Sequence, residues 1–175
     1  MQQPEVWLRG PVEGVPPVLM PAAHALLQSA EDLRRVTLPL TVRELWITPG
    51  GAASVGFHLR HVAGSIDRLL TYARGEGLDD RQRAALAAEG EPGDPPEEAA
   101  PLVEGAEAAI RRAVETLRST PEGSVFEPRK VGRAGLPSTV LGLLFHLAEH
   151  TQRHTGQVIA TARIVRGLGL VDASR

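Results

Sequence analysis

The feature that most limits the fold of this chain is helical periodicity in four long segments, which stretches rich in Gly and Pro separate from one another. Apolar residues recur every three or four positions in residues 22–36, 55–74, 97–119 and 137 to 167 or 169. Such spacing gives a helix one apolar face, which has to be buried against other helices. No segment shows strand periodicity, no internal repeat is present, and residues 124–136 are predicted to form a loop. The sequence therefore predicts an all-α protein, a four-helix bundle.

The connection between the second and third predicted helices is long, roughly residues 77–97. It contains a short helical stretch, residues 79–90, and then a linker rich in Pro and Gly, residues 91–96. Antiparallel neighbours need only about 2–8 linking residues, whereas about 20 residues can cross the whole length of a bundle. We therefore expect the second and third helices to run parallel.

The composition favours a protein that acts on small molecules over one that binds nucleic acid or membranes. The net charge is −2, and the basic residues are scattered arginines apart from one lysine, Lys130. Aromatic residues make up 3% of the chain, too few for a platform on which bases stack. No apolar run approaches the roughly 20 residues that cross a bilayer, and the N-terminus lacks the layout of a signal peptide. We expect one cytoplasmic domain of 175 residues, with its core in residues 22–169.

Three histidines, His146, His150 and His154, follow one another at four-residue spacing in the last predicted helix. Positions i, i+4 and i+8 lie on one helix face, which Gln157 shares. Neutral imidazole is a common ligand of divalent metals. Because the chain contains no cysteine, any metal must be held by histidine, carboxylate and water. The spacing therefore predicts a metal site that needs a third ligand from another helix.

Two histidines in the second predicted helix, His58 and His61, are candidates for that third ligand. His58 borders the apolar stripe, and His61 lies roughly 60° further round the helix, on the side of Tyr72. Three histidines with an open position are typical of a catalytic metal site, unlike the closed set of four ligands in a structural one. Periodicity slightly favours His58 and leaves the choice open.

The segment Ser54–Arg68, followed after a long gap by the HxxxHxGQ motif of His150–Gln157, resembles the DinB/YfiT-like family. The resemblance covers about residues 22–169. It implies a four-helix bundle of up-down-down-up order, which agrees with the long second connection. It also implies a metal triad of His61, His150 and His154, since the stretch after His61 matches the apolar-small-small-polar stretch that follows the ligand of the family.

The resemblance further implies a divalent metal, usually zinc or nickel and sometimes manganese or iron. Characterised relatives include thiol-dependent transferases and isomerases. We therefore expect a metal-dependent enzyme that uses a low-molecular-weight thiol on a small electrophilic substrate. A metal-dependent hydrolase and a non-catalytic bundle that binds a metal or a ligand are the alternatives. The resemblance also suggests a homodimer, because relatives often pair through helix faces.

Five further residues are candidates for roles around the triad. His146 and His58 are interpreted as hydrogen-bonding or core residues, and His58 also as a proton carrier. Gln157 could bond a ligand imidazole or a substrate, and Tyr72 is either a hydroxyl donor or a core residue. Arg153 could bind an anionic substrate or form a surface ion pair.

Overall fold

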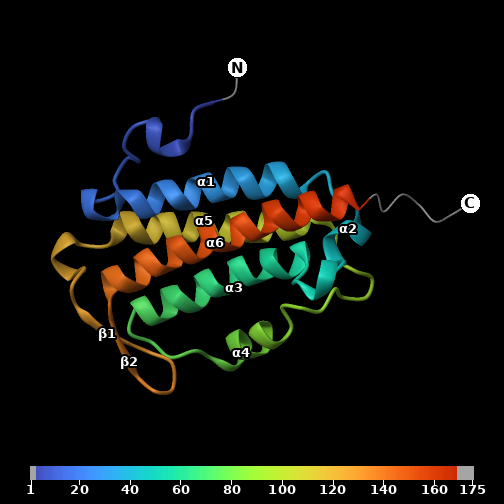
Figure 1. Ribbon diagram of the computed structural model, residues 1–175. Coiled ribbons are helices and arrows are strands. Elements are labelled where there is room, and N and C mark those ends of the chain that lie inside the picture. The colour runs from blue at the N-terminus through green and yellow to red at the C-terminus, as the bar shows by residue number, and fades with distance from the viewer. Residues whose placement is uncertain (1–2, 169–175) are drawn as a thin grey trace, which may run out of the picture.

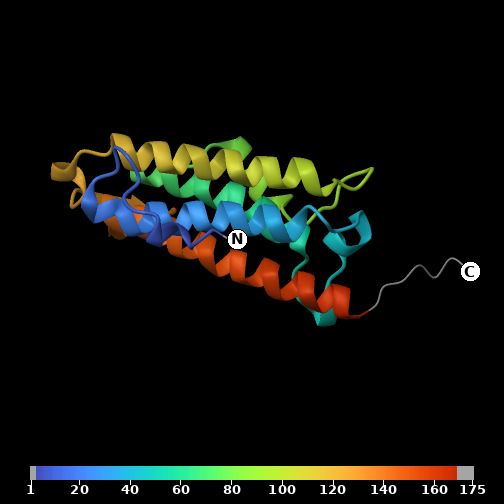
Figure 2. The ribbon, with the colours of Figure 1, turned by 90° about the horizontal axis from the view of Figure 1, so that it is seen from above.

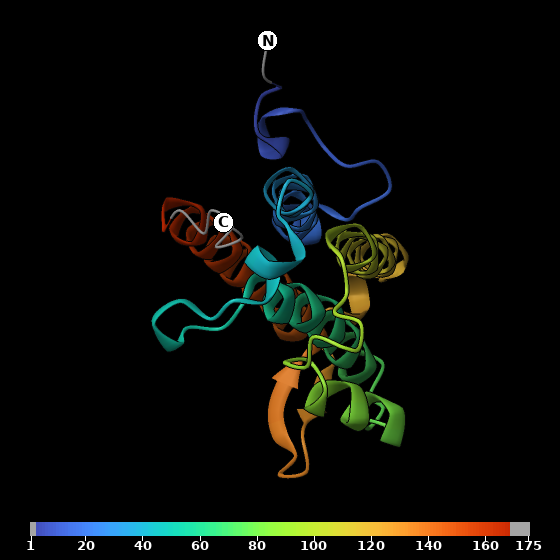
Figure 3. The same ribbon diagram turned by 90° about the vertical axis from the view of Figure 1, so that its right-hand side faces the viewer.

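The computed structural model describes residues 3–168, which are mainly helical and include one small sheet. The predicted segments form the four long helices α1 (Met20–Thr37), α3 (Val55–Ala73), α5 (Ala99–Ser119) and α6 (Val140–Gly167). These helices lie side by side in Figure 1, and Figure 3 shows them end-on around a shared interior. The prediction of a mainly helical protein is confirmed. The alternative end of the last helix at residue 169 lies outside the described residues.

The four long helices run in two opposite directions. The colours of Figures 1 and 2 show that α1 and α6 point one way along the molecule, while α3 and α5 point the other way. Helix α1 packs against α5 and α6, and so does α3. The connection from α3 to α5 contains the short helix α4 (Asp80–Ala87), which contacts α3 on the outside of the molecule.

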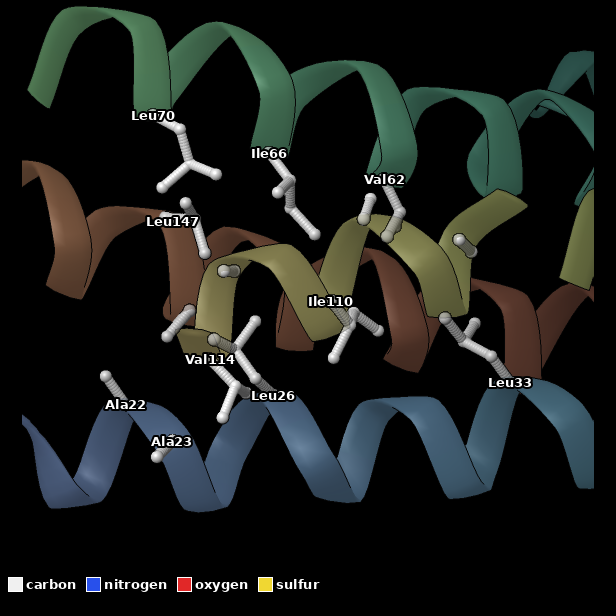
Figure 4. Packing of buried hydrophobic residues seen from close by; sticks show 14 of the residues in the cluster. Ala22, Ala23, Leu26, Leu33, Val62, Ile66, Leu70, Ile110, Val114 and Leu147 are labelled. Carbon is white, nitrogen blue, oxygen red and sulfur yellow. The ribbon is translucent and has the colours of Figure 1, made fainter. Parts of the chain in front are cut away.

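The core between the long helices is apolar and receives side chains from all four of them (Figure 4). At most 1% of the surface of each of these side chains is exposed: Leu26, Leu33, Val62, Ile66, Ile110 and Leu147. Burial of a side chain of this size contributes about 1.5–3 kcal/mol to folding. This apolar packing determines which faces of α3 and α6 meet, and those two helices carry five of the six histidines.

Side-chain caps fix where α3 and α6 begin. The Ser54 hydroxyl accepts a hydrogen bond from the Phe57 amide at 3.1 Å and caps α3. The Thr139 hydroxyl accepts one from the Gly142 amide at 3.0 Å. Each cap satisfies an amide that the helix leaves unpaired and contributes about 1 kcal/mol.

The prediction of a loop without strands was wrong. Strand β1 (Pro128–Val131) pairs antiparallel with β2 (Leu136–Thr139), so residues 137–139 form a strand and do not open the last helix. Gly132 and Gly135 have φ values of 68° and 61°, which suit the tight reversal between the strands. Strands of four residues are too short to show a clear alternation of apolar and polar side chains.

Helix α2 (Val42–Trp46) was missing from the prediction, because five residues carry no helical periodicity. Its start nevertheless carries a signal, since Thr41 and Glu44 form a reciprocal capping box. The remaining short elements are 3-10 turns at Val6–Leu8, Pro17–Leu19, Pro49–Gly51 and Glu122–Ser124. Within residues 3–168, no helix combines the length and the apolar character that a membrane span requires.

Candidate metal centre

His61 of α3 meets His150 and His154 of α6 in a compact cluster. One ring nitrogen from each histidine lies within 4.8 Å of the other two. The Nε2 atoms of His61 and His150 are 2.9 Å apart, and the three ring centroids are 4.4–5.2 Å apart. All three side chains are half-buried. The structure thus brings together the three residues of the triad that the resemblance implied.

The packing of α6 explains why these histidines are only half-buried. His150 and His154 each precede a fully buried threonine, Thr151 and Thr155 respectively. The threonine hydroxyls donate to backbone carbonyls one turn earlier, at 2.8 Å in both cases. His150 and His154 therefore lie at the edge of the buried face, where imidazoles can contact α3 and still reach solvent.

A buried carboxylate, that of Glu89 just after α4, contacts the triad. Oε2 of Glu89 lies 2.7 Å from Nδ1 of His61, and Oε1 accepts a hydrogen bond from Nη1 of Arg68 at 2.7 Å. Burial alone would raise the pKa of Glu89, but the hydrogen bonds from His61 and Arg68 outweigh it and leave this pKa below its usual value. The sequence reasoning missed Glu89, because the short helix before it has no apolar stripe that would show which carboxylate turns inward.

The donor set fits a divalent metal ion. Because Nδ1 of His61 is bonded to a carboxylate, the hydrogen-bond network assigns its proton to Nδ1 and leaves a lone pair on Nε2. Zinc–nitrogen bonds of about 2.0–2.1 Å place two tetrahedral ligand nitrogens about 3.3 Å apart. A small outward shift from the observed 2.9 Å between His61 and His150 meets that spacing. Nδ1 of His150 is buried without a hydrogen-bond partner among the described residues, an uncommon state for a polar atom outside functional sites.

Burial favours the neutral form of two members of the triad, His150 and His154. It is the main cause that lowers the pKa of His154 to about 4, and the neighbouring histidines lower it further. Burial also lowers the pKa of His150, with a smaller contribution from His61. Neutral imidazole is the form that binds metals, so protons do not compete for these nitrogens at neutral pH.

The rings of the other two candidate histidines each lie beside a triad ring, His58 at 5.1 Å from His154 and His146 at 5.3 Å from His150 between ring centroids. His58 is 5% exposed, and its Nδ1 atom lies 3.0 Å from Nδ1 of His154. Burial lowers the pKa of His58 to about 4, with a further contribution from His61. His146 is exposed, and its Nδ1 atom lies 2.7 Å from Oε1 of Glu149. The buried His58 therefore hydrogen-bonds a member of the triad, whereas the exposed His146 hydrogen-bonds Glu149.

The remaining predicted candidates, Gln157, Arg153 and Tyr72, lie outside the cluster. Gln157 is exposed. Arg153 is also exposed, and its Nη2 donates to both carboxylate oxygens of Glu149 at 2.8 and 3.0 Å. Tyr72 is half-buried against the core, about three helical turns and about 16 Å beyond His61 along α3.

A cavity of about 1030 Å³ lies between the N-terminal residues and α1. Its lining includes Arg9 and His24 but none of the triad histidines. These two side chains already have partners, since Arg9 pairs with Glu31 at 2.5 Å and Nε2 of His24 lies 3.0 Å from the Gly10 carbonyl oxygen. This cavity therefore adds no residue to the candidate metal centre.

Comparison with known proteins shows the family to which the chain belongs. No curated protein matches the chain by sequence. A family model described as the DinB superfamily matches residues 25–158, a range that includes His61, His150, His154 and Glu89. Since that range is well over half of the chain, this protein belongs to the DinB superfamily.

Proposed function

We propose that this protein holds a divalent metal ion on His61, His150 and His154 and is a metal-dependent enzyme. Its proposed reaction transfers a low-molecular-weight thiol to a small electrophilic molecule, or isomerises such a molecule. The observation that carries the proposal is the convergence of three imidazole nitrogens from two helices within 4.8 Å. Three histidine ligands leave a position for substrate or water, which is typical of catalytic sites. Nitrogen ligands favour zinc or nickel over manganese and iron.

The metal and the protein would contribute different parts of the chemistry. A bound divalent ion lowers the pKa of a thiol or of water and so supplies a nucleophile at neutral pH. Among the protein residues, the triad holds the ion, and Phe57 packs on the His61 ring at 5.4 Å with an interplanar angle of 16°. This stacking shields one face of the ring from water. Because the chain has no cysteine, the thiol must belong to a second molecule.

We also propose that α1, α3, α5 and α6 form the up-down-down-up four-helix bundle implied by the family resemblance, as one domain. Support comes from the shared direction of α3 and α5, opposite to that of α1 and α6, and from the packing of α1 and α3 against both other helices. A cytoplasmic location and a homodimer are parts of the same proposal.

A metal-dependent hydrolase is the second candidate, since a half-buried site admits water as readily as a thiol. Turnover of an electrophile that requires both metal and thiol would support the transferase or isomerase. Hydrolysis of an ester or amide without thiol would support the hydrolase. A tightly bound ion with neither activity would indicate a non-catalytic binding protein.

Elemental analysis of the purified, untagged protein by mass spectrometry tests the site itself. We expect about one zinc or nickel ion per chain, removed by chelation and lost in His154→Ala. The matched control is His146→Ala, which changes a histidine on the same helix that bonds Glu149 on the surface. A wild-type protein that carries no ion and takes up neither zinc nor nickel on addition would contradict the proposal.

A further inference from the structure

The long connection between α3 and α5 buries a single side chain between residues 80 and 97, and that side chain is the carboxylate of Glu89. Helix α4 itself buries none of its residues, and its largest apolar side chain, Leu86, is 44% exposed. This segment therefore adds little to the apolar core. Since burial of a charged group is costly unless partners compensate for it, the reason for burying Glu89 lies in its contacts.

Both oxygens of Glu89 are used by side chains of α3. One lies 2.7 Å from Nδ1 of His61, and the other accepts from Arg68 at 2.7 Å. His61 and Arg68 are about two turns apart on the same face of α3, so one carboxylate can bridge them. The side chains of Arg68 and Glu89 are 11% and 6% exposed, which makes this ion pair a buried one.

Gly64, which lies between His61 and Arg68 on α3, leaves the space that this ion pair occupies. A Cβ atom at Gly64 would lie 2.5 Å from Oε1 of Glu89 and 2.7 Å from Nη1 of Arg68. Real Cβ atoms essentially never come that close to other heavy atoms, so any larger residue would displace the pair. The sequence of α3 thus provides a donor, a space and a counter-charge for one carboxylate.

Arg60, one turn before Gly64 on α3, holds the backbone around Glu89. Its guanidinium donates to the carbonyl oxygens of Ala88, Glu91 and Pro92. Hydrogen bonds to α3, and not apolar packing, therefore hold the backbone that carries Glu89. The connection is tied to the same helix that carries His61.

We propose that Glu89 is a positioning residue of the metal centre. Its carboxylate, placed by Arg68 in the space that Gly64 leaves, keeps the proton of His61 on Nδ1 and directs Nε2 toward the ion. The role toward the ion depends on the proposed function, whereas control of the His61 tautomer is a property of the protein alone. Metal-bound histidines commonly donate their second N–H to such a partner, and its loss typically weakens metal binding by about 10–100-fold.

The first test removes the negative charge of Glu89 and keeps the shape of its side chain. We expect Glu89→Gln to weaken zinc binding by about 10-fold or more, measured by competition with a chromophoric chelator. Glu91→Gln is the matched control, because it changes an exposed carboxylate in the same connection and should bind zinc like the wild type. Equal zinc affinity in Glu89→Gln and Glu91→Gln would contradict the proposal.

The second test moves the ion pair without removing either charge. Gly64→Ala places a methyl group where the Glu89 and Arg68 side chains meet. Its zinc affinity should therefore fall below that of the wild type, as in Glu89→Gln. Gly105→Ala on α5 is its control, since a Cβ atom there meets nothing within 4 Å. Thermal melts of the zinc-free variants establish that each one is folded before its affinity is compared.

The third test needs no metal and so separates the two proposals. Long-range 1H–15N NMR spectra of the zinc-free wild type should show His61 with its proton on Nδ1, and Glu89→Gln should shift it toward a mixture of tautomers. If the wild type binds no zinc, the proposed function fails and these spectra still decide the role of Glu89. A His61 tautomer that is unchanged in Glu89→Gln overturns the positioning role, even where zinc binding has weakened.

Discussion

The Nδ1 atoms of His58 and His154 lie 3.0 Å apart, so one of these rings donates a hydrogen bond to the other. His154 has two ring nitrogens, and the contact with His58 leaves its Nε2 atom for an ion. His61 belongs to the cluster of three, whereas His58 supports one of its members from outside. His58 and His61, the two candidates for the third ligand, thus have different places in the structure.

This relationship predicts that alanine substitutions of His58 and His61 weaken zinc binding to different extents. His58→Ala should keep close to one ion per chain but bind zinc about 10-fold more weakly, because His154 loses a partner that orients it. His61→Ala should lose tight binding altogether, because it removes a ligand. Zinc titration of both variants with a competing chelator measures the difference. A His58→Ala variant that loses the ion while His61→Ala retains it would make our choice of third ligand wrong.

The neutral histidines predict that the metal-free protein loses stability in acid. In the folded protein the pKa values of His58 and His154 are about 4, below the value of about 6.5 expected in the unfolded chain. Between these values the unfolded chain binds protons that the folded protein does not, so the free energy of unfolding falls as the pH falls from about 6.5 toward about 4.

Urea unfolding of chelator-treated protein at several pH values between about 7.5 and about 4.5 measures this effect, which we expect to be on the order of 1–3 kcal/mol. His58→Gln removes one of the two groups and should flatten the pH dependence. The same slope in His58→Gln and in the wild type would show that the His58 ring is protonated to the same extent in both states.

A tight contact between α2 and α3 predicts a stability loss away from the site. A Cβ atom at Gly56 would lie 2.7 Å from the ring of Trp46. That ring cannot move easily, since its Nε1 donates to the Glu97 carbonyl at 2.9 Å and the Arg60 guanidinium lies 4.9 Å from its centroid. Gly56→Ala should therefore destabilise the protein by about 1–3 kcal/mol, although alanine favours helices by about 1 kcal/mol.

Urea unfolding of Gly56→Ala beside Gly105→Ala checks this expectation. Gly105 also lies within a long helix, but a Cβ atom there meets nothing within 4 Å, so its substitution should stabilise the protein by up to about 1 kcal/mol. Equal stability changes in the two variants would mean that the Trp46 ring moves aside at no cost.

The sequence predicted those parts of the fold that depend on long periodic segments. Helix α3 begins at residue 55, as predicted, and α6 carries the HxxxH pair at the edge of its buried face. The hairpin and α2 were missed because each element is shorter than the window in which periodicity can be recognised. Long helices bury continuous stripes, whereas short elements depend on contacts that the sequence pattern does not display.

The residues of the candidate site were likewise predictable from the sequence only in part. His150 and His154 follow from helix geometry, and the choice of His61 over His58 required the family resemblance, since both side chains face α6. Glu89 could not be predicted from periodicity, because it follows a helix that buries none of its residues. Its contact with His61 depends on the path of the whole connection from α3 to α5, which is fixed by tertiary hydrogen bonds.

Removal of the metal should lower the stability of the protein, because the triad joins α3 to α6 and an ion held there links the two helices. A ligand that binds only the folded state at 100 times its dissociation constant stabilises that state by about 2.7 kcal/mol. We therefore expect a chelator to lower the free energy of unfolding of the zinc-loaded wild type by about 2–4 kcal/mol. It should leave His150→Ala unchanged, because that variant has no ion to lose.

His146→Ala provides the comparison that makes this measurement specific, because it removes a histidine from the same helix without removing a ligand of the triad. Its response to the chelator should equal that of the wild type. If the chelator destabilises His150→Ala as much as the wild type, the stabilising ion is bound elsewhere, and the link between α3 and α6 through the triad does not exist. If it destabilises the wild type and His146→Ala alone, the metal centre contributes to the stability of the fold as well as to its chemistry.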